Sequence, residues 1–152
     1  MKNVIKIMTI AAIVLFSVGI VSAALNSGLQ APAEFVHSEY WDKNSFMDIW
    51  CLPNDNNTRL DINKYDVETD GILFESDSSV EYSVTPMGNN IAMFTDGSGN
   101  SGGVMEVVEF NGEKYLVSAY LASESSPEKA KDCMKYLDEF NKLNNVEAIA
   151  YA

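Results

Sequence analysis

The chain is 152 residues long and carries 22 acidic side chains against 10 lysine and arginine side chains, which gives a formal net charge of −12. A surface this acidic repels phosphate groups, so the composition argues against a protein that binds nucleic acid. The length suits one domain with a buried core.

The first 24 residues have the layout of an export signal. Lys2 and Lys6 precede an apolar run over residues 7–25, which ends in the small residues of positions 21–24. The alternative is an uncleaved membrane anchor, because about 19 apolar residues can just span a bilayer. Either interpretation places the rest of the chain in the extracellular space or on the outer face of the cytoplasmic membrane, because Lys2 and Lys6 stay on the cytoplasmic side. Membrane contact is expected only through residues 7–25, and only if they are retained.

Removal of residues 1–24 from the 152 would leave 128 residues. The net charge would change from −12 to −14, because the removed segment contains two lysines and no acid. Residues 25–34 are predicted to form a flexible lead-in. Residues 35–152 are predicted to form a single α+β domain.

This domain begins with a segment rich in aromatic residues. We expect a strand or short helix over 35–41 and a strand over 46–52, followed by a turn-rich loop over 53–57. Asn56 in this loop opens an Asn-Asn-Thr sequon, which makes it a candidate for N-glycosylation. The aromatic side chains of the segment either fill the core or line a ligand groove.

The middle of the chain predicts two strands and a loop. Apolar and polar residues alternate over 80–85, which predicts a half-buried strand. The sequence Gly-Asn-Asn at 88–90 predicts a turn, residues 91–94 a further strand, and residues 96–103 a loop rich in glycine and serine.

The strongest local signal is Asn111-Gly112, which lies between two β-rich runs, residues 104–110 and 113–121. Asn-Gly supplies the positive φ angles of a two-residue type I′ turn, so we expect a tight β-hairpin. The expected cross-strand pairs are Phe110 with Glu113, Glu109 with Lys114, Val108 with Tyr115 and Val104 with Ala119.

Residues 126–144 predict the main helix. Ser126 can cap it, and Pro127 suits the first helical position, where its missing N–H costs nothing. Apolar residues recur on one face: Ala130, Cys133, Met134, Leu137, Phe140 and Leu143. Residues 146–151 are predicted to form a closing strand. The expected architecture is therefore α+β: an antiparallel sheet of five to seven strands with one main C-terminal helix packed on one face.

Two stretches, residues 110–117 and 136–144, resemble small exported proteins of methanogenic archaea. Those proteins carry an export segment followed by a compact α+β domain. The resemblance covers about a third of the chain and implies the same compartment and fold class. Its motifs are a hairpin turn and a core-facing helix, which are structural, so no functional residue carries over.

Ser101 lies in the sequence Gly-Asn-Ser-Gly-Gly, which resembles the nucleophile loop of trypsin-like serine proteases. The base would be His37, the only histidine of the chain. The order of the two residues fits, but the chain is too short for the two barrels of that family and no orienting acid stands out. A hairpin loop rich in glycine and serine explains the same residues. A small serine hydrolase that uses Ser101 and His37 is therefore an alternative function.

Asp96, Ser98 and Asn100 alternate like the first ligands of a calcium loop, and Glu106 lies one residue before the place of the closing glutamate. The same residue types are favoured in ordinary turns for backbone reasons. A calcium-binding surface domain is the second alternative function.

The two cysteines, Cys51 and Cys133, have two interpretations. In an exported chain they can form one disulfide, or both can be small buried hydrophobic residues. No glycine loop for a phosphate group is present, and no cofactor is expected. The preferred function is a non-catalytic secreted or cell-envelope domain that binds another envelope or extracellular component.

Overall fold

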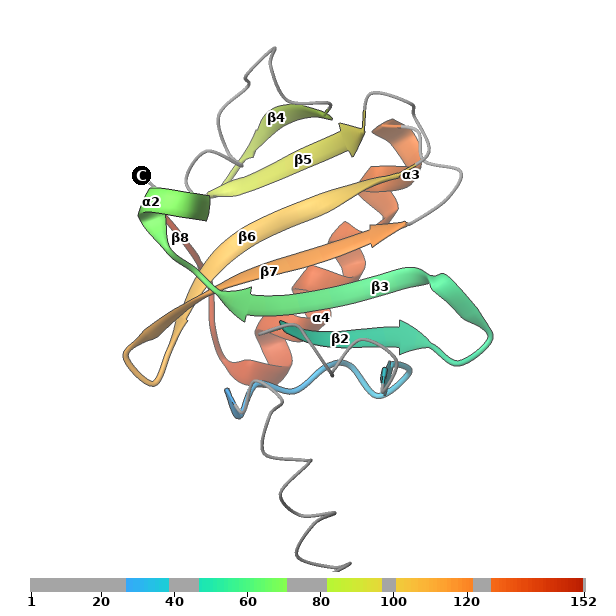
Figure 1. The fold of residues 1–152 in the computed structure, drawn as a ribbon, viewed down its shortest axis with the longest axis horizontal. Coiled ribbons are helices and arrows are strands. Elements are labelled where there is room, and N and C mark those ends of the chain that lie inside the picture. Colours follow the sequence, from blue (N-terminus) through green and yellow to red (C-terminus); the bar gives the residue numbers. More distant parts are fainter. Residues whose placement is uncertain (1–26, 39–46, 71–81, 97–100, 122–126, 152) are drawn as a thin grey trace, which may run out of the picture.

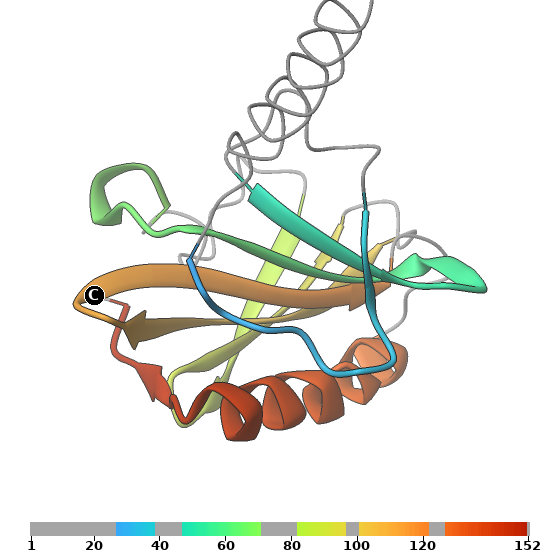
Figure 2. The same ribbon diagram turned by 90° about the horizontal axis from the view of Figure 1, so that it is seen from below.

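A computed structural model describes residues 27–38, 47–70, 82–96, 101–121 and 127–151. The predicted export segment lies outside these residues. Among the residues described, no helix is both long and apolar enough to cross a membrane. They form an antiparallel sheet with the C-terminal helices packed on one face (Figures 1 and 2), which confirms the predicted α+β class.

Within the described residues the sheet contains eight strands, one more than the upper end of the predicted range. Seven of them lie in the order β1-β2-β3-β7-β6-β5-β4, and β8 pairs with β6. The strands are β1 (Val36–His37), β2 (Met47–Leu52), β3 (Asp55–Lys64), β4 (Tyr82–Gly88), β5 (Ile91–Asp96), β6 (Gly102–Phe110), β7 (Glu113–Leu121) and β8 (Ala148–Ile149). The helices are α2 (Val67–Asp70), α3 (Pro127–Asp132) and α4 (Met134–Asn144).

The β6–β7 hairpin forms in the predicted register. Its pairs include Phe110 with Glu113, Glu109 with Lys114, Val108 with Tyr115 and Val104 with Ala119. Asn111 and Gly112 have φ angles of 53° and 79°, as a type I′ turn requires. A two-residue turn fixes the register of both strands, so the local sequence was enough to predict the cross-strand pairs.

β3 is the element that the sequence interpretation missed. The turn predicted over 53–57 is confined to Pro53 and Asn54, and a strand of ten residues begins at Asp55. β3 pairs with β2 on one side and β7 on the other. Its buried residues include Asp61 as well as Leu60 and Ile62, so β3 is buried on both faces of the sheet.

The C-terminal helix is interrupted at Cys133. The Cys133 N–H donates to the Ala130 carbonyl at 3.1 Å, and the Tyr136 N–H donates to the Cys133 carbonyl at 3.0 Å. Both bonds span three residues, so the chain passes from α3 to α4 through a tighter turn. Cys133 and Leu137 face the core as predicted, whereas Leu143 is 50% exposed. The proposed cap, Ser126, lies outside the described residues.

The closing strand is shorter than predicted and occupies an unusual place. β8 pairs with Val107 and Val108 of β6, whereas β5 pairs with Gly102 to Glu106 of the same strand. The two strands therefore lie end to end along one edge of β6. Their junction lies beside Glu106, which shares a groove with residues from the second half of α4.

Residues 27–34, predicted to be a flexible lead-in, are held against the core instead. Leu29 is 6% exposed and belongs to the main hydrophobic cluster. The Asn144 side chain accepts a hydrogen bond from the Gln30 N–H and donates one to the Gln30 carbonyl, both at 2.8 Å. This pair of bonds ties the segment to the end of α4.

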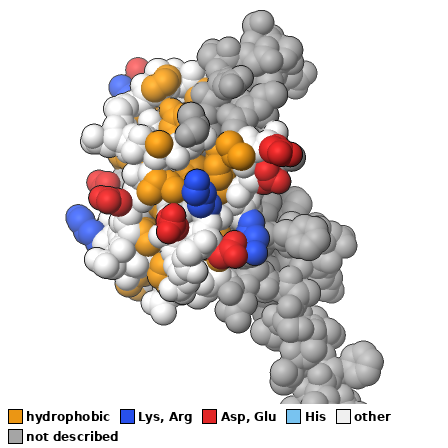
Figure 3. Space-filling model, turned by 90° about the vertical axis from the view of Figure 1, so that its left-hand side faces the viewer, with side chains coloured by type: hydrophobic (Ala, Val, Ile, Leu, Met, Phe, Trp, Pro, Cys, Tyr) orange, Lys and Arg blue, Asp and Glu red, His pale blue; other side chains and the backbone are white. Residues whose placement is uncertain are grey.

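Each face of the sheet carries a hydrophobic cluster. The larger cluster lies between the sheet and the helices and includes Leu60, Val104, Val117, Leu137 and Phe140. The smaller cluster includes Val84, Met105 and Leu116, and Tyr65 and Tyr151 pack against it. The Tyr65 hydroxyl donates to the Tyr151 carbonyl at 2.6 Å, which fixes the C-terminal residues. The end of the molecule with α2 and the β6–β7 turn shows hydrophobic side chains among acidic and basic ones (Figure 3).

Candidate functional site

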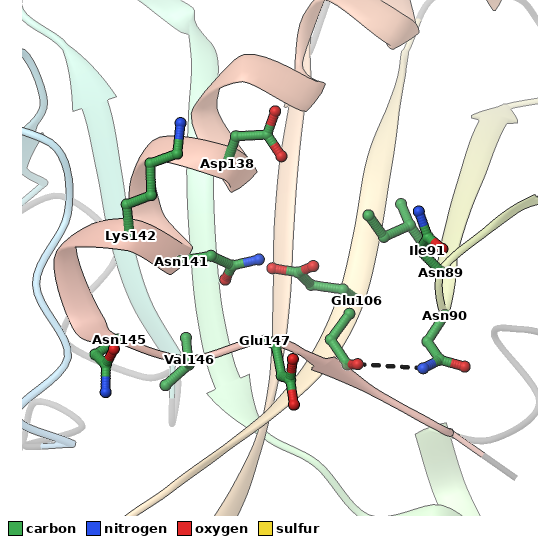
Figure 4. Close-up of a pocket in the computed structure, with 11 residues that line it drawn as sticks. Asn89, Asn90, Ile91, Glu106, Asp138, Asn141, Lys142, Asn145, Val146 and Glu147 are labelled. Carbon is green, nitrogen blue, oxygen red and sulfur yellow. Dashed lines mark hydrogen bonds between the residues drawn. The ribbon is translucent and has the colours of Figure 1, made fainter.

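A groove of about 660 Å³ opens where β5, β6, β8 and α4 meet. This volume lies within the range of about 300–1,000 Å³ that is usual for small-molecule sites. Its walls are the second half of α4 with the residues that lead to β8, and the β4–β5 turn lies across from them (Figure 4). Glu106 of β6 forms the floor between these walls.

Three of the asparagines at the rim of the groove occupy positions where the backbone requires a positive φ angle. Asn89 and Asn90 form the β4–β5 turn with φ angles of 52° and 60°, and Asn145 ends α4 with a φ of 52°. Asparagine tolerates these left-handed conformations better than other residues with side chains. The Asn90 side chain also donates to the Ala148 carbonyl at 3.1 Å and joins the turn to β8 (Figure 4).

Glu106 is the most unusual residue of the groove. It is 0% exposed and lies opposite Ile91 in the sheet, on the helix-facing side with Val104 and Val108. Neither carboxyl oxygen has a hydrogen-bond partner of good geometry among the described residues. Figure 4 shows the side-chain nitrogen of Asn141 directed toward the Glu106 carboxyl group. A buried acid without such partners is rare and points to a functional role or to a bound ligand.

Burial raises the pKa of Glu106 from its ordinary value of 4.5 to about 7, because removal of water penalises the charged form. The neighbouring Asn141 amide partly opposes the rise, and the charge of Asp138 adds to it. The carboxyl group therefore changes its charge near neutral pH. It can donate a hydrogen bond when protonated and bind a cationic group when ionised.

The described lining residues are mainly negative in charge. Glu106, Asp138 and Glu147 are acidic, and Lys142 is the basic member. Asp138 and Lys142 come from α4, and Glu147 precedes β8. The groove thus has an acidic floor, an acidic rim and several neutral amides.

The structure does not bring Ser101 and His37 together. His37 is in β1 and Ser101 directly precedes β6, and β2, β3 and β7 lie between those two strands. Four interstrand spacings amount to roughly 19 Å along the sheet, far beyond hydrogen-bond reach. His37 instead lies 3.5 Å from Asp48, measured between Nε2 and Oδ1, and its ring packs edge-on against Trp50. The geometry therefore gives the hydrolase hypothesis no support.

The residues of the predicted calcium loop are also dispersed. Ser98 and Asn100 lie outside the described residues. Asp96 ends β5, whereas Glu106 pairs with Ile91 at the beginning of that strand, so roughly 17 Å of strand separates the two acids. Among the described residues, no group of three or more His, Cys, Asp or Glu side chains could hold a metal ion. Glu106 therefore belongs to the groove rather than to the loop after β5.

Cys51 and Cys133 are both free and buried. Trp50 pairs with Leu60 of the helix-facing cluster, and successive strand residues point to opposite faces. Cys51 therefore points away from the helices, whereas Cys133 lies among them in the core. The sheet separates the two thiols, which is the reason why the structure has no bridge. Burial raises the pKa of both, that of Cys133 to about 11.

The candidate glycosylation site, Asn56, lies at the start of β3 rather than in a loop. Thr58, the third residue of the sequon, is buried and its hydroxyl donates to Asp55 at 2.6 Å. Whether the sequon is used stays a prediction.

A second polar cluster lies on the face of the sheet away from the helices. Arg59 Nη2 lies 3.1 Å from Asp61 Oδ2, and the guanidinium carbon lies 5.0 Å from the centre of the Tyr120 ring. Burial raises the pKa of Asp61, and Arg59 opposes that rise. The side chains in this cluster interact with one another, so it stabilises the sheet rather than forming an open site.

The chain matches no protein-family model, no curated protein and no solved structure. The functional interpretation therefore rests on the groove itself. Sequence reasoning named Glu106 only as an approximate calcium ligand. A better signal was available, because Glu106 takes the place of an apolar residue in the alternating series Val104, Glu106 and Val108.

Proposed function

We propose that this chain is an exported, non-catalytic binding module that takes a small polar ligand in the groove above Glu106. The observation that carries the proposal is a buried acid whose two oxygens lack good hydrogen-bond partners among the described residues, at the floor of a groove of about 660 Å³. Such an arrangement costs stability, and a ligand that donates hydrogen bonds would offset that cost.

The proposed compartment is the extracellular space or the outer face of the cytoplasmic membrane. The basic and apolar pattern of residues 1–24 supports this placement. The resemblance to small exported proteins of methanogenic archaea is consistent with it. The ligand would then be a component of the envelope or of the surrounding medium.

A non-catalytic role fits the composition of the groove. A carboxyl group with a pKa near 7 would also suit a general acid. However, the described lining residues include no hydroxyl, thiol or imidazole side chain that could act as a nucleophile beside it. Binding is therefore the function that the lining residues support best.

NMR titration of the isotope-labelled protein tests the proposal. The panel comprises N-acetylglucosamine, a neutral dipeptide, butylammonium, butyrate and calcium chloride. We expect saturable shifts of the Ile91, Glu106 and Asn141 amide signals with at least one compound, and loss of these shifts in Glu106→Gln. Glu109→Gln is the matched control, because it removes the same charge from an exposed position of the same strand. If no compound of any class shifts these signals, the proposal fails.

A further inference from the structure

Three buried acceptor atoms in the groove lack a hydrogen-bond donor of good geometry among the described residues: Glu106 Oε1, Glu106 Oε2 and Asn141 Oδ1. Glu106 lies in β6 and Asn141 in α4, so two elements supply them to one cavity. A buried acceptor without a donor typically costs about 1–3 kcal/mol. The ligand group that best matches these three acceptor oxygens is one that carries several hydrogen-bond donors on a single atom.

The charges around the groove limit the class of ligand further. The described lining residues include three acids, Glu106, Asp138 and Glu147, and one basic residue, Lys142, so they have an excess of negative charge. A carboxylate or phosphate ligand would add acceptors and repulsion and would bring no donor to any of the three oxygens. A hydroxyl group brings one donor and no charge. A primary ammonium group brings three donors and a positive charge.

We infer that the groove binds a small molecule through a primary alkylammonium group, which donates hydrogen bonds to the Glu106 carboxylate and to the Asn141 side-chain oxygen. This inference rests on the proposed function and names its ligand class. The bonds to Glu106 are charge-assisted, and they are stronger than such bonds in water because the carboxyl group is buried. Asp138 and Glu147 at the rim attract the cation from solution.

Binding should depend on pH, because the ammonium group requires the ionised carboxylate. The other titratable groups that face the site are Asp138 and Lys142 from α4 and Glu147 before β8, while the β4–β5 turn contributes only neutral amides. An alkylamine with a pKa of about 10.4 stays charged from pH 5 to pH 8. Since the Glu106 pKa is about 7, affinity should fall roughly 100-fold between pH 8 and pH 5.

The test is an NMR titration of the whole protein at pH 8 with four compounds that share a butyl chain: butylammonium, butyltrimethylammonium, butan-1-ol and butyrate. We expect butylammonium to bind with a roughly millimolar dissociation constant, given its small size, and the other three compounds not to saturate. Glu106→Gln should lose at least about 30-fold in affinity, and Asn141→Ala should lose about threefold or more. Glu109→Gln should bind as the unchanged protein does.

Three results would overturn the inference while leaving the proposed function intact. The first is equal binding of butyltrimethylammonium, which would show that charge alone suffices. The second is a butylammonium affinity in the unchanged protein that does not vary between pH 5 and pH 8, a test that does not depend on how any variant folds. The third is Glu106-dependent binding of N-acetylglucosamine or calcium in the groove without binding of butylammonium. Absence of any binding in the groove would instead refute the proposed function.

Discussion

Glu106 occupies a position where an apolar residue would make the folded protein more stable. Its neighbours on the same face of β6, Val104 and Val108, are both 0% exposed and belong to the main hydrophobic cluster. Because the acid is buried without good hydrogen-bond partners among the described residues, its ionisation opposes folding. The stability of the protein should therefore respond to pH through this residue.

We predict that the free energy of unfolding falls as the pH rises from 4.5 to about 7, the range over which Glu106 is protonated in the folded protein but ionised in the unfolded chain. The unfolded chain loses the proton near the ordinary value of 4.5, whereas the folded protein keeps it until about pH 7. The stabilising contribution is complete below pH 4.5 and is lost progressively up to about pH 7. The full loss amounts to about 3 kcal/mol. Urea unfolding at a series of pH values measures it.

The control for this prediction is Glu106→Leu, which removes the titration and fills the same space with apolar atoms. At pH 8 we expect this variant to be more stable than the unchanged protein by about 1–3 kcal/mol, because replacement of a buried charge by a hydrophobic residue is often stabilising. Its stability should show no step between pH 4.5 and pH 7 from this position. If the step persists in the variant, another group causes it.

The close approach of strands β6 and β7 depends on one glycine, Gly103 of β6. A Cβ atom added to Gly103 would lie 2.2 Å from the Ala119 carbonyl oxygen and 2.4 Å from the Tyr120 Cβ. These are atoms of the neighbouring strand close to its backbone, so a side-chain rotation cannot relieve the contact. The sequence predicts that this glycine ends a loop over residues 96–103, whereas the structure places it inside β6.

We predict that Gly103→Ala destabilises the protein by on the order of 3 kcal/mol or more, because the two central strands must move apart. Gly88→Ala is the comparison: it has no atom within 4 Å of the added group, but its φ is +85°. That variant should cost only about 1–2 kcal/mol, from backbone strain. Chemical unfolding of both variants measures the difference, and equal costs would refute the steric explanation.

The elements that could be predicted from the sequence are those fixed by local chemistry. The Asn111-Gly112 turn sets the register of β6 and β7, and the Gly88-Asn89-Asn90 turn places β4 and β5. β3 was missed although residues 59–63 alternate polar and apolar, because the turn-forming residues at 53–57 conceal where the strand begins. The local sequence around Cys133 also gives no sign of the break between α3 and α4.

The candidate site could not be predicted, because it depends on how distant segments meet. Spacing along the chain suggested a calcium loop with Asp96 and Glu106, but the antiparallel pairing of β5 and β6 directs the two acids to opposite ends of β5. Asn141 and Glu106 are 35 positions apart in the sequence and meet only because α4 packs on β6. Ser101 and His37 are far apart for a similar reason, because the strand order of the sheet places β2, β3 and β7 between them.

For the whole molecule we predict two free cysteines in the mature protein. The two thiols lie on opposite sides of the sheet, and burial keeps both protonated at neutral pH. Intact-mass measurement should find no loss of two hydrogens, and both thiols should react with an alkylating reagent only after unfolding. The same spectrum should show a chain that begins near Ala24 or Leu25 if the export signal is cleaved. A mass lower by two hydrogens would contradict the separation of the thiols.

The end-to-end placement of β5 and β8 leaves a break in one edge of β6. β8 has only two residues, and it can detach from β6 without breaking any bond between β5 and β6. The Asn90 side chain, bonded to the Ala148 carbonyl, bridges this break. The C-terminal strand is therefore a unit of local opening, which amide hydrogen exchange detects as faster exchange at Val107 and Ile149 than at Val104. A ligand in the groove would contact both sides of the break and hold it closed, so slower exchange at these amides would report occupancy without a label on the ligand.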